Sequence, residues 1–264
     1  MQDFLLELKI RNETLFYYGL LCLAAALMFL LLGKISLLQL QQVNVWYKPF
    51  KFAFSTFTFA WAMAWYCYYL PAFNVQLFNW SVMALLSFEI VYIAIMAGVG
   101  KPSHFNVSTA FYASMFSLMA LAATVVTLYT AYVGVLFFVN DFPSLPSHYL
   151  WSIRLGILLF VIFSFEGFLM GSRMSHSVGS INDNSNLFVL GWSRKVGDLR
   201  VAHFIGMHAL QLLPLASFYL LKNTRATVVM AVFYSLIALF TLLQALNGRP
   251  FLPEKPDKKI STSK

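Results

Sequence analysis

Residues 191–215, GWSRKVGDLRVAHFIGMHALQLLPL, place titratable side chains where a polar loop becomes an apolar run. Asp198 and Arg200 precede the run, and His203 and His208 lie in its first turns. Carboxylate, guanidinium and imidazole groups can bind ions, exchange protons or hold a polar ligand. Such groups are costly in a bilayer unless they are paired, protonated or hydrated. The segment therefore predicts one wall of a polar site.

The histidine spacing limits the metal chemistry of this segment. His203 and His208 are five residues apart, so on an α-helix they point about 140° away from each other. They do not form the i,i+4 pair of an HExxH zinc site. A metal or haem would need ligands from different helices, for example His104 with His203, and these three histidines are only weak candidates. His208 shares a helix face with Gln211 instead.

Other polar residues fall inside or beside the apolar runs. Glu89 and Glu166 lie inside such runs, where a carboxylate usually faces neighbouring helices and often marks function. Most of the others lie where the chain enters or leaves a run on one predicted side of the membrane. The sequence identifies no catalytic residue. The candidate ligand-binding residues are Lys48, Glu89, His104, Asn106, Glu166, Arg173, His176, Asp198, Arg200, His203, His208 and Gln211.

Each candidate also has a purely structural interpretation. Lys48, Lys51 and Arg200 can extend their charged groups to the interface while their aliphatic stems cover apolar surface. Asp198 can cap the helix that follows it. The two glutamates inside apolar runs can be protonated and hydrogen-bonded to a neighbouring helix. These alternatives fit the residues one by one, whereas their clustering at one depth favours a shared site.

The composition predicts a membrane protein. Of 264 residues, 60% are hydrophobic and 11% are charged, against about 25% charged in a typical soluble domain. The net charge of +8 comes from short loops between apolar runs, which argues against nucleic acid as a partner and is typical of loops beside membrane spans. The two cysteines both lie inside apolar runs and predict buried thiols.

The lengths of the apolar runs predict the architecture. A helix needs about 20 predominantly apolar residues to cross the hydrocarbon core. We therefore expect an all-α membrane protein, a bundle of seven transmembrane helices within residues 1–249. The seven spans are predicted at about 15–32, 50–70, 79–99, 109–139, 151–171, 201–221 and 228–247.

The distribution of Lys and Arg predicts the direction of the spans. One predicted side carries 13 of the 18 basic residues, in the loops 33–49, 100–108 and 172–200 with the adjacent Lys51 and in the tail 250–264 with the adjacent Arg249. The other side carries 4. By the positive-inside rule the N-terminus lies outside and the C-terminal basic tail lies in the cytoplasm.

Five segments carry a further signal: VWYKPFKFAFS (45–55), GKPSHFNVST (100–109), WSIRLG (151–156), SHSVG (175–179) and residues 191–215. They resemble a family of uncharacterised bacterial polytopic membrane proteins with W-x-KP-x-KF, SHFN, HSVG and GDLR-x-xHF-x-GxHALQ segments. Two departures are Lys101-Pro102, where that family has Arg-Gly, and the loop after HSVG. The resemblance implies an architecture and no reaction. It points to Trp46, Lys48, Pro49, Lys51, His104, Asn106, Arg154, His176, Asp198, Arg200, His203, His208 and Gln211.

Three functional hypotheses follow. The first is a cytoplasm-facing polar cavity in a multi-pass protein of the cell membrane, in bacteria the inner membrane, that binds, senses or transports a small molecule or ion. The second is an intramembrane redox protein or enzyme with haem b or a metal as cofactor. The third is a structural or assembly subunit of a membrane complex. The lipid bilayer is the expected partner in all three, and a homo-oligomer is compatible with each.

Overall fold

The computed structural model describes residues 2–40, 42–70, 72–179 and 186–254, and α-helices dominate this part of the chain. Two small antiparallel sheets accompany them, one pairing β1 (Gln39–Leu40) with β2 (Val43–Asn44) and one pairing β3 (Ser177–Val178) with β4 (Gly197–Asp198). The helices are α1 (Gln2–Arg11), α2 (Glu13–Ile35), α3 (Tyr47–Cys67), α4 (Val75–Gly98), α5 (Ala110–Val139), α6 (Ser147–Ser172), α7 (Arg200–Ala216), the π-helical turn η1 (Ser217–Leu221) and α8 (Thr224–Leu246).

Six helices in the described residues are long and apolar enough to cross a membrane. Large apolar side chains such as Phe233, Leu236 and Phe240 of α8 point outward and are more than half exposed. An apolar exterior of this kind suits lipid rather than water. The expectation of an all-α, multi-pass membrane protein is confirmed at this level. The six are α2, α4, α5, α6, α7 together with η1, and α8.

The predicted span 50–70 is the one missing from these six, so the apolar helices fall one short of the expected seven. It forms most of α3, which is 21 residues long but is less apolar than the other helices of similar length. Lys48 and Lys51 in its first turns lower its hydropathy. Its inward face carries small or flexible residues such as Ala60 and Met63, which are fully buried.

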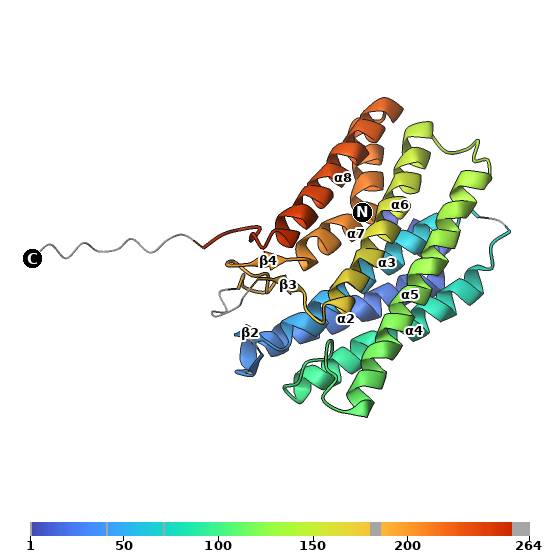
Figure 1. Cartoon of the computed structure of the whole chain (residues 1–264). Coiled ribbons are helices and arrows are strands. Elements are labelled where there is room, and N and C mark those ends of the chain that lie inside the picture. Colours follow the sequence, from blue (N-terminus) through green and yellow to red (C-terminus); the bar gives the residue numbers. More distant parts are fainter. Residues whose placement is uncertain (1, 41, 71, 180–185, 255–264) are drawn as a thin grey trace, which may run out of the picture.

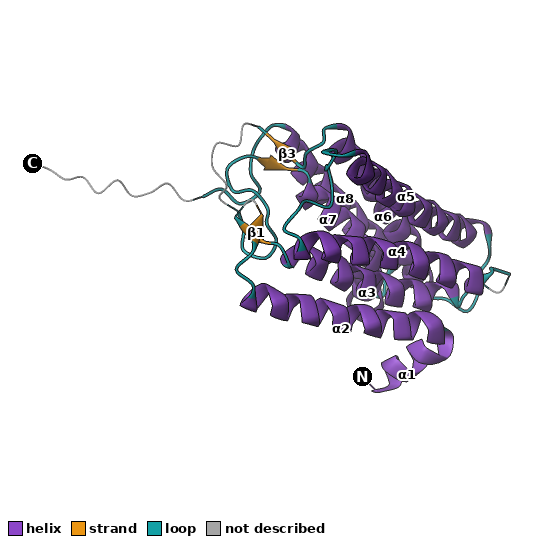
Figure 2. Cartoon of the chain, turned by 90° about the horizontal axis from the view of Figure 1, so that it is seen from below, coloured by secondary structure: helices purple, strands orange, loops and turns teal. Residues whose placement is uncertain are grey.

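The helices run between two ends of the bundle, and Figures 1 and 2 show both small sheets at the same end. We call this the basic end and define it by residues 36–40, 42–46, 99–109, 173–179, 186–199 and 247–254. Contacts between Lys51 and Leu190 and between Arg194 and Glu254 join its segments. The opposite end consists of α1 and residues 68–70, 72–74, 140–146 and 222–223. The predicted grouping of the basic loops at one end is therefore present in the fold.

The α6–α7 pair, which positions much of the polar sequence, packs closely through glycines. A Cβ at Gly206 would lie 1.9 Å from the Phe163 side chain, and one at Gly156 would lie 2.9 Å from the carbonyl oxygen of Ala209. Small residues let membrane helices approach in this way. The contact fixes the start of α7, and with it Arg200, against α6.

The predicted tail after residue 249 is described only at its beginning. The Gln244 side chain donates to the Pro250 carbonyl oxygen at 2.8 Å, and the Glu254 amide donates to the Arg194 carbonyl oxygen at 3.2 Å. This first part of the tail therefore lies against the basic end. Residues 255–264, which carry most of its predicted charge, lie outside the described residues, as do residues 180–185 of the loop after SHSVG.

Candidate polar site at the basic end

Asp198 and Arg200 form the best-defined element of the basic end. The Asp198 side chain is fully buried, and its carboxylate accepts hydrogen bonds from Arg200 Nη2 at 2.6 Å and Nε at 2.9 Å. It also accepts from the backbone amides of Ser193 at 2.9 Å and of Arg200 at 3.1 Å. Burial alone would raise the pKa of Asp198, but these donors hold it below its ordinary value. The carboxylate is therefore ionised and fully used.

Asp198 also accepts a hydrogen bond from the amide of Arg200, the first residue of α7, although the residue directly before the helix is Leu199, which has no side-chain cap. The Arg200 guanidinium continues past the carboxylate and donates to the carbonyl oxygen of Gly191. One side chain thus ties the loop before β4 to the start of α7.

His176 lies beside this pair at the start of the β3–β4 sheet. Its Nδ1 is 3.8 Å from Asp198 Oδ1 and 3.0 Å from Ser177 Oγ, and its carbonyl oxygen accepts from the Leu199 amide. Burial lowers the pKa of His176 to about 4, and Arg200 adds to the shift while Asp198 opposes it. The imidazole is therefore neutral at pH 7.

Lys48 and His104 join α3 to the loop between α4 and α5. Lys48 Nζ lies 3.1 Å from His104 Nδ1, and Ser103 Oγ lies 3.2 Å from the same nitrogen. The imidazole ring packs against Phe52 and Phe116. Burial, and secondly the Lys48 charge, hold the pKa of His104 well below its ordinary value. His104 is therefore neutral and accepts a hydrogen bond from the lysine.

Lys51 extends the group toward the loop before β4. Its ammonium donates to the Leu190 carbonyl oxygen at 2.6 Å, across 139 positions of the chain. Lys51 lies in electrostatic range of Arg200 and Asp198, and Lys48 lies in range of Lys51, Arg200 and the buried Glu89. The Lys48–His104 pair and the Asp198–Arg200 pair therefore belong to one connected group. We call it the polar site, consisting of Lys48, Lys51, Glu89, His104, His176, Asp198 and Arg200.

Two loops of the polar site have unusual backbone conformations. Phe105, next to His104, has φ of 58°, and Val189, next to Leu190, has φ of 63°. A left-handed conformation is unfavourable for side chains of this kind and costs on the order of 1–3 kcal/mol. Such conformations are frequent at functional sites. They set the positions of the His104 ring and of the carbonyl that Lys51 contacts.

Several predicted site residues lie apart from the polar site in their contacts. Glu166 Oε2 is 3.3 Å from His203 Nδ1, which is also 2.7 Å from the Phe163 carbonyl oxygen. His208 Nδ1 is 2.7 Å from the carbonyl oxygen of Phe204, one turn earlier. Glu166 and His203 therefore form a second polar pair, between α6 and α7, and the His208 contact lies within α7.

The remaining predicted residues have local roles or stand at the edge. Asn106 shapes the loop before α5, donating to the Pro102 carbonyl oxygen and accepting from Ser108. Arg173 is exposed at the end of α6. Gln211 Oε1 is buried and has no hydrogen-bond partner within the described part of the chain.

The weak metal candidates have different neighbours. His104 contacts Lys48 and Ser103, whereas His203 contacts Glu166 and Phe163. Within residues 2–254, apart from the undescribed positions 41, 71 and 180–185, no three His, Cys, Asp or Glu side chains come together as metal ligands. The two imidazoles therefore have separate sets of neighbours.

The polar site also contains groups that are not among the predicted ligand-binding residues. Lys51 follows Lys48 by three positions, a spacing that puts both on one helix face. This spacing is the feature of the sequence that indicates Lys51 as a site residue. The carbonyl groups of Leu190 and Gly191 carried no signal, because backbone acceptors are not visible in side-chain chemistry. Their role depends on the folded loop.

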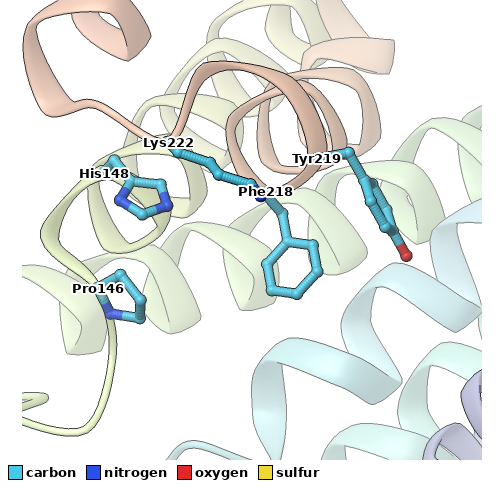
Figure 3. Close-up of a pocket in the computed structure, with 5 residues that line it drawn as sticks. All are labelled: Pro146, His148, Phe218, Tyr219 and Lys222. Atoms are coloured by element: carbon cyan, nitrogen blue, oxygen red, sulfur yellow. The ribbon is translucent and has the colours of Figure 1, made fainter.

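A hollow lies at the opposite end, away from the predicted site. Figure 3 shows His148 and Lys222 at its rim with Phe218 and Tyr219 beside them, where η1 meets the start of α6. Its volume is about 270 Å³. It is lined mainly by apolar surface, and it contains none of the predicted ligand-binding residues.

Comparison with known proteins gives no assignment. No family model matches the chain, and no curated protein or solved structure matches it.

Proposed function

We propose that this chain is a seven-span protein of the cell membrane, bacterial in origin, that binds a small molecule or ion at the polar site for sensing or transport. Its N-terminus lies outside, and its basic end faces the cytoplasm. Membership of the uncharacterised family that the sequence resembles is part of the proposal. It is supported by the convergence of residues from three of that family's segments, Lys48, His104 and Arg200.

Support for a seventh crossing comes from the contacts of α3. Lys48 contacts His104 at the basic end, while Trp65, near the last residue of α3, stacks on Arg11 at the opposite end. A helix packed inside a bundle needs less apolar surface than one surrounded by lipid, because neighbouring helices satisfy its polar groups. The low hydropathy of α3 is therefore compatible with crossing.

The observation that carries the function is the convergence of ionisable groups from three separate parts of the chain. Lys48 and Lys51 come from α3, His104 from the loop after α4, and Arg200 with its carboxylate partner from the start of α7. Taking such groups out of water costs several kcal/mol per ion before pairing. Packing alone does not require this arrangement, whereas a polar ligand does.

The orientation is tested by single-cysteine labelling in intact cells. Ala72→Cys, between α3 and α4, is expected to react with a membrane-impermeant maleimide from outside, and Lys34→Cys is expected to react only after the membrane is opened. Cys22 and Cys67 are buried, so background labelling is low. Protection of Ala72→Cys together with Lys34→Cys would mean that α3 does not cross.

Binding is tested by thermal unfolding of the purified protein with a panel of cations, anions and neutral metabolites. We expect at least one class to raise the midpoint, because a ligand that binds only the folded state stabilises it by about 2.7 kcal/mol at 100 times its dissociation constant. Arg200→Gln is expected to abolish the shift. A panel without effect on the wild type would contradict the binding function.

A further inference from the structure

Positive charge exceeds usable negative charge at the polar site. Lys48, Lys51 and Arg200 are in electrostatic range of one another, and Asp198 is occupied by Arg200 and two backbone amides. Glu89 lies in range of Lys48, but no ion pair within 4 Å joins Glu89 to either lysine. The two ammonium groups therefore lack a bonded counter-ion among the described residues.

The partners that the lysines do have are neutral. Lys48 donates to the imidazole of His104, and Lys51 donates to the Leu190 carbonyl oxygen. An ammonium carries three N–H donors, so each lysine keeps two for another acceptor. Arg200 uses Nε and Nη2, which leaves Nη1 without a hydrogen bond to any residue that the structure describes. Unused charged donors remain on three side chains.

The positions of these cations in their helices add to the imbalance. Lys48 and Lys51 lie in the first two turns of α3, and Arg200 is the first residue of α7. A helix N-terminus carries partial positive charge and favours anions. Two helix starts and three cations therefore make the same region positive, and only one bonded carboxylate opposes them.

We propose that the polar site binds a compact oxyanion, a phosphate or carboxylate group, between Lys48, Lys51 and Arg200. This rests on the proposed function and names its ligand class. An oxyanion offers several acceptor oxygens in different directions, which matches donors that come from two helices. His104 and the Leu190 carbonyl orient the lysines by taking one N–H from each.

The anion can come from a free solute or from a phospholipid headgroup, since the basic end lies where both are available. The two sources share the same chemistry and differ in how they arrive. Delipidated protein in detergent tests the free anion, and nanodiscs of phosphatidylglycerol compared with phosphatidylcholine test the lipid.

The experiment is equilibrium binding of radiolabelled inorganic phosphate and of succinate to the purified full chain. We expect about one site per chain for at least one probe, and affinity at least about tenfold weaker in Lys48→Met and Lys51→Met because each loses a charged hydrogen bond. Lys51→Arg keeps the charge and should keep most of the binding. Lys34→Met, which removes an exposed lysine at the same end, is the matched control and should leave affinity unchanged.

The outcomes separate this inference from the function on which it rests. Stabilisation by phosphatidylglycerol alone, lost in Lys51→Met, assigns the anion to lipid and supports the inference. Binding of a cationic or neutral ligand that is lost in Arg200→Gln would overturn the inference that the ligand is an anion. It would leave the proposed binding function unchanged. Anion binding that survives both lysine variants would overturn the inference. No binding of phosphate, succinate or phosphatidylglycerol would overturn the inference, and the proposed function falls only if no member of the wider ligand panel stabilises the wild type.

Discussion

The two ends of the bundle handle buried polar groups in opposite ways. At the opposite end, Arg11 lies 3.8 Å from the Trp65 ring and within 5 Å of the Tyr68 and Tyr69 rings, and its Nε donates to Glu7 at 2.8 Å. The cation is thus paired with one carboxylate and enclosed by aromatic faces, while its buried Nη1 has no hydrogen-bond partner among the described residues. At the basic end, cations outnumber the carboxylates bonded to them.

Amide groups show the same contrast. Asn12 and Asn79 exchange two hydrogen bonds, of 3.0 and 2.9 Å, and Asn12 also caps α2 through the Leu15 amide. These groups satisfy one another and connect α2 to α4. A self-satisfied polar contact stabilises a helix pair without a ligand, whereas the three cations of the polar site have one bonded carboxylate among them. The two ends therefore differ in how many carboxylates are bonded to their buried cations.

The largest effect is expected at the one carboxylate that holds the basic end together. Asp198→Ala leaves Arg200 without its partner and frees two backbone amides, and losing one member of a buried pair costs about 3–5 kcal/mol. We expect a fall of this size in the free energy of unfolding, measured by SDS titration. A change below about 1 kcal/mol would mean that the pair is solvated and that the two ends do not differ in this respect.

The second expected effect is a pH dependence to which the basic end contributes. Because folding lowers the pKa of His176 from 6.5 to about 4, the unfolded chain binds more protons than the folded protein between these values. Stability is therefore complete above pH 6.5 and falls by at most about 3 kcal/mol as the pH drops to 4. His104 contributes in the same direction.

Asp198 acts below that window. Its pKa is lowered in the folded protein, so the stability that it contributes is present above its ordinary value of 3.8 and is lost on further acidification. The contribution of His176 is checked by measuring the free energy of unfolding of the wild type and of His176→Gln from pH 7 to pH 4. An equal slope in both would remove His176 as a cause.

The smallest effect is expected at the opposite end. Asn79→Ala leaves the Asn12 amide without its buried partner, which costs about 1–2 kcal/mol. A double-mutant cycle with Asn12→Ala should give a coupling energy of about 1 kcal/mol. Phosphate binding should stay at the wild-type level in all three variants. Loss of binding in Asn79→Ala would show that the two ends are not independent.

The grouping of the basic loops could be predicted because it depends only on helix lengths and alternating direction. Spans that alternate in direction, as the sequence predicts them, bring residues 33–49, 100–108 and 172–200 to one end whatever their packing. Composition does not show which helices lie inside the bundle. The sequence therefore could not show that α3, whose two lysines lower its hydropathy, differs from the other predicted spans. This is why the count of strongly apolar helices is one lower than expected.

The pairings within the site could be predicted only in part. The link between Asp198 and the start of α7 follows from local sequence, since a carboxylate two residues before a helix commonly caps it. The Lys48–His104 and Glu166–His203 contacts depend on how helices rotate against each other. Single-sequence patterns carry no such information, so residues at one depth were predicted as one site and the fold divides them.

The most direct test of the difference between the two ends is thermal unfolding of Lys51→Met and Arg11→Met with and without inorganic phosphate and succinate. We expect Lys51→Met to keep or raise the midpoint without either anion and to lose the anion-induced rise. Arg11→Met should lower the midpoint and keep that rise. The reverse pattern, with Lys51→Met destabilised and still responding to the anions while Arg11→Met no longer responds, would contradict the account.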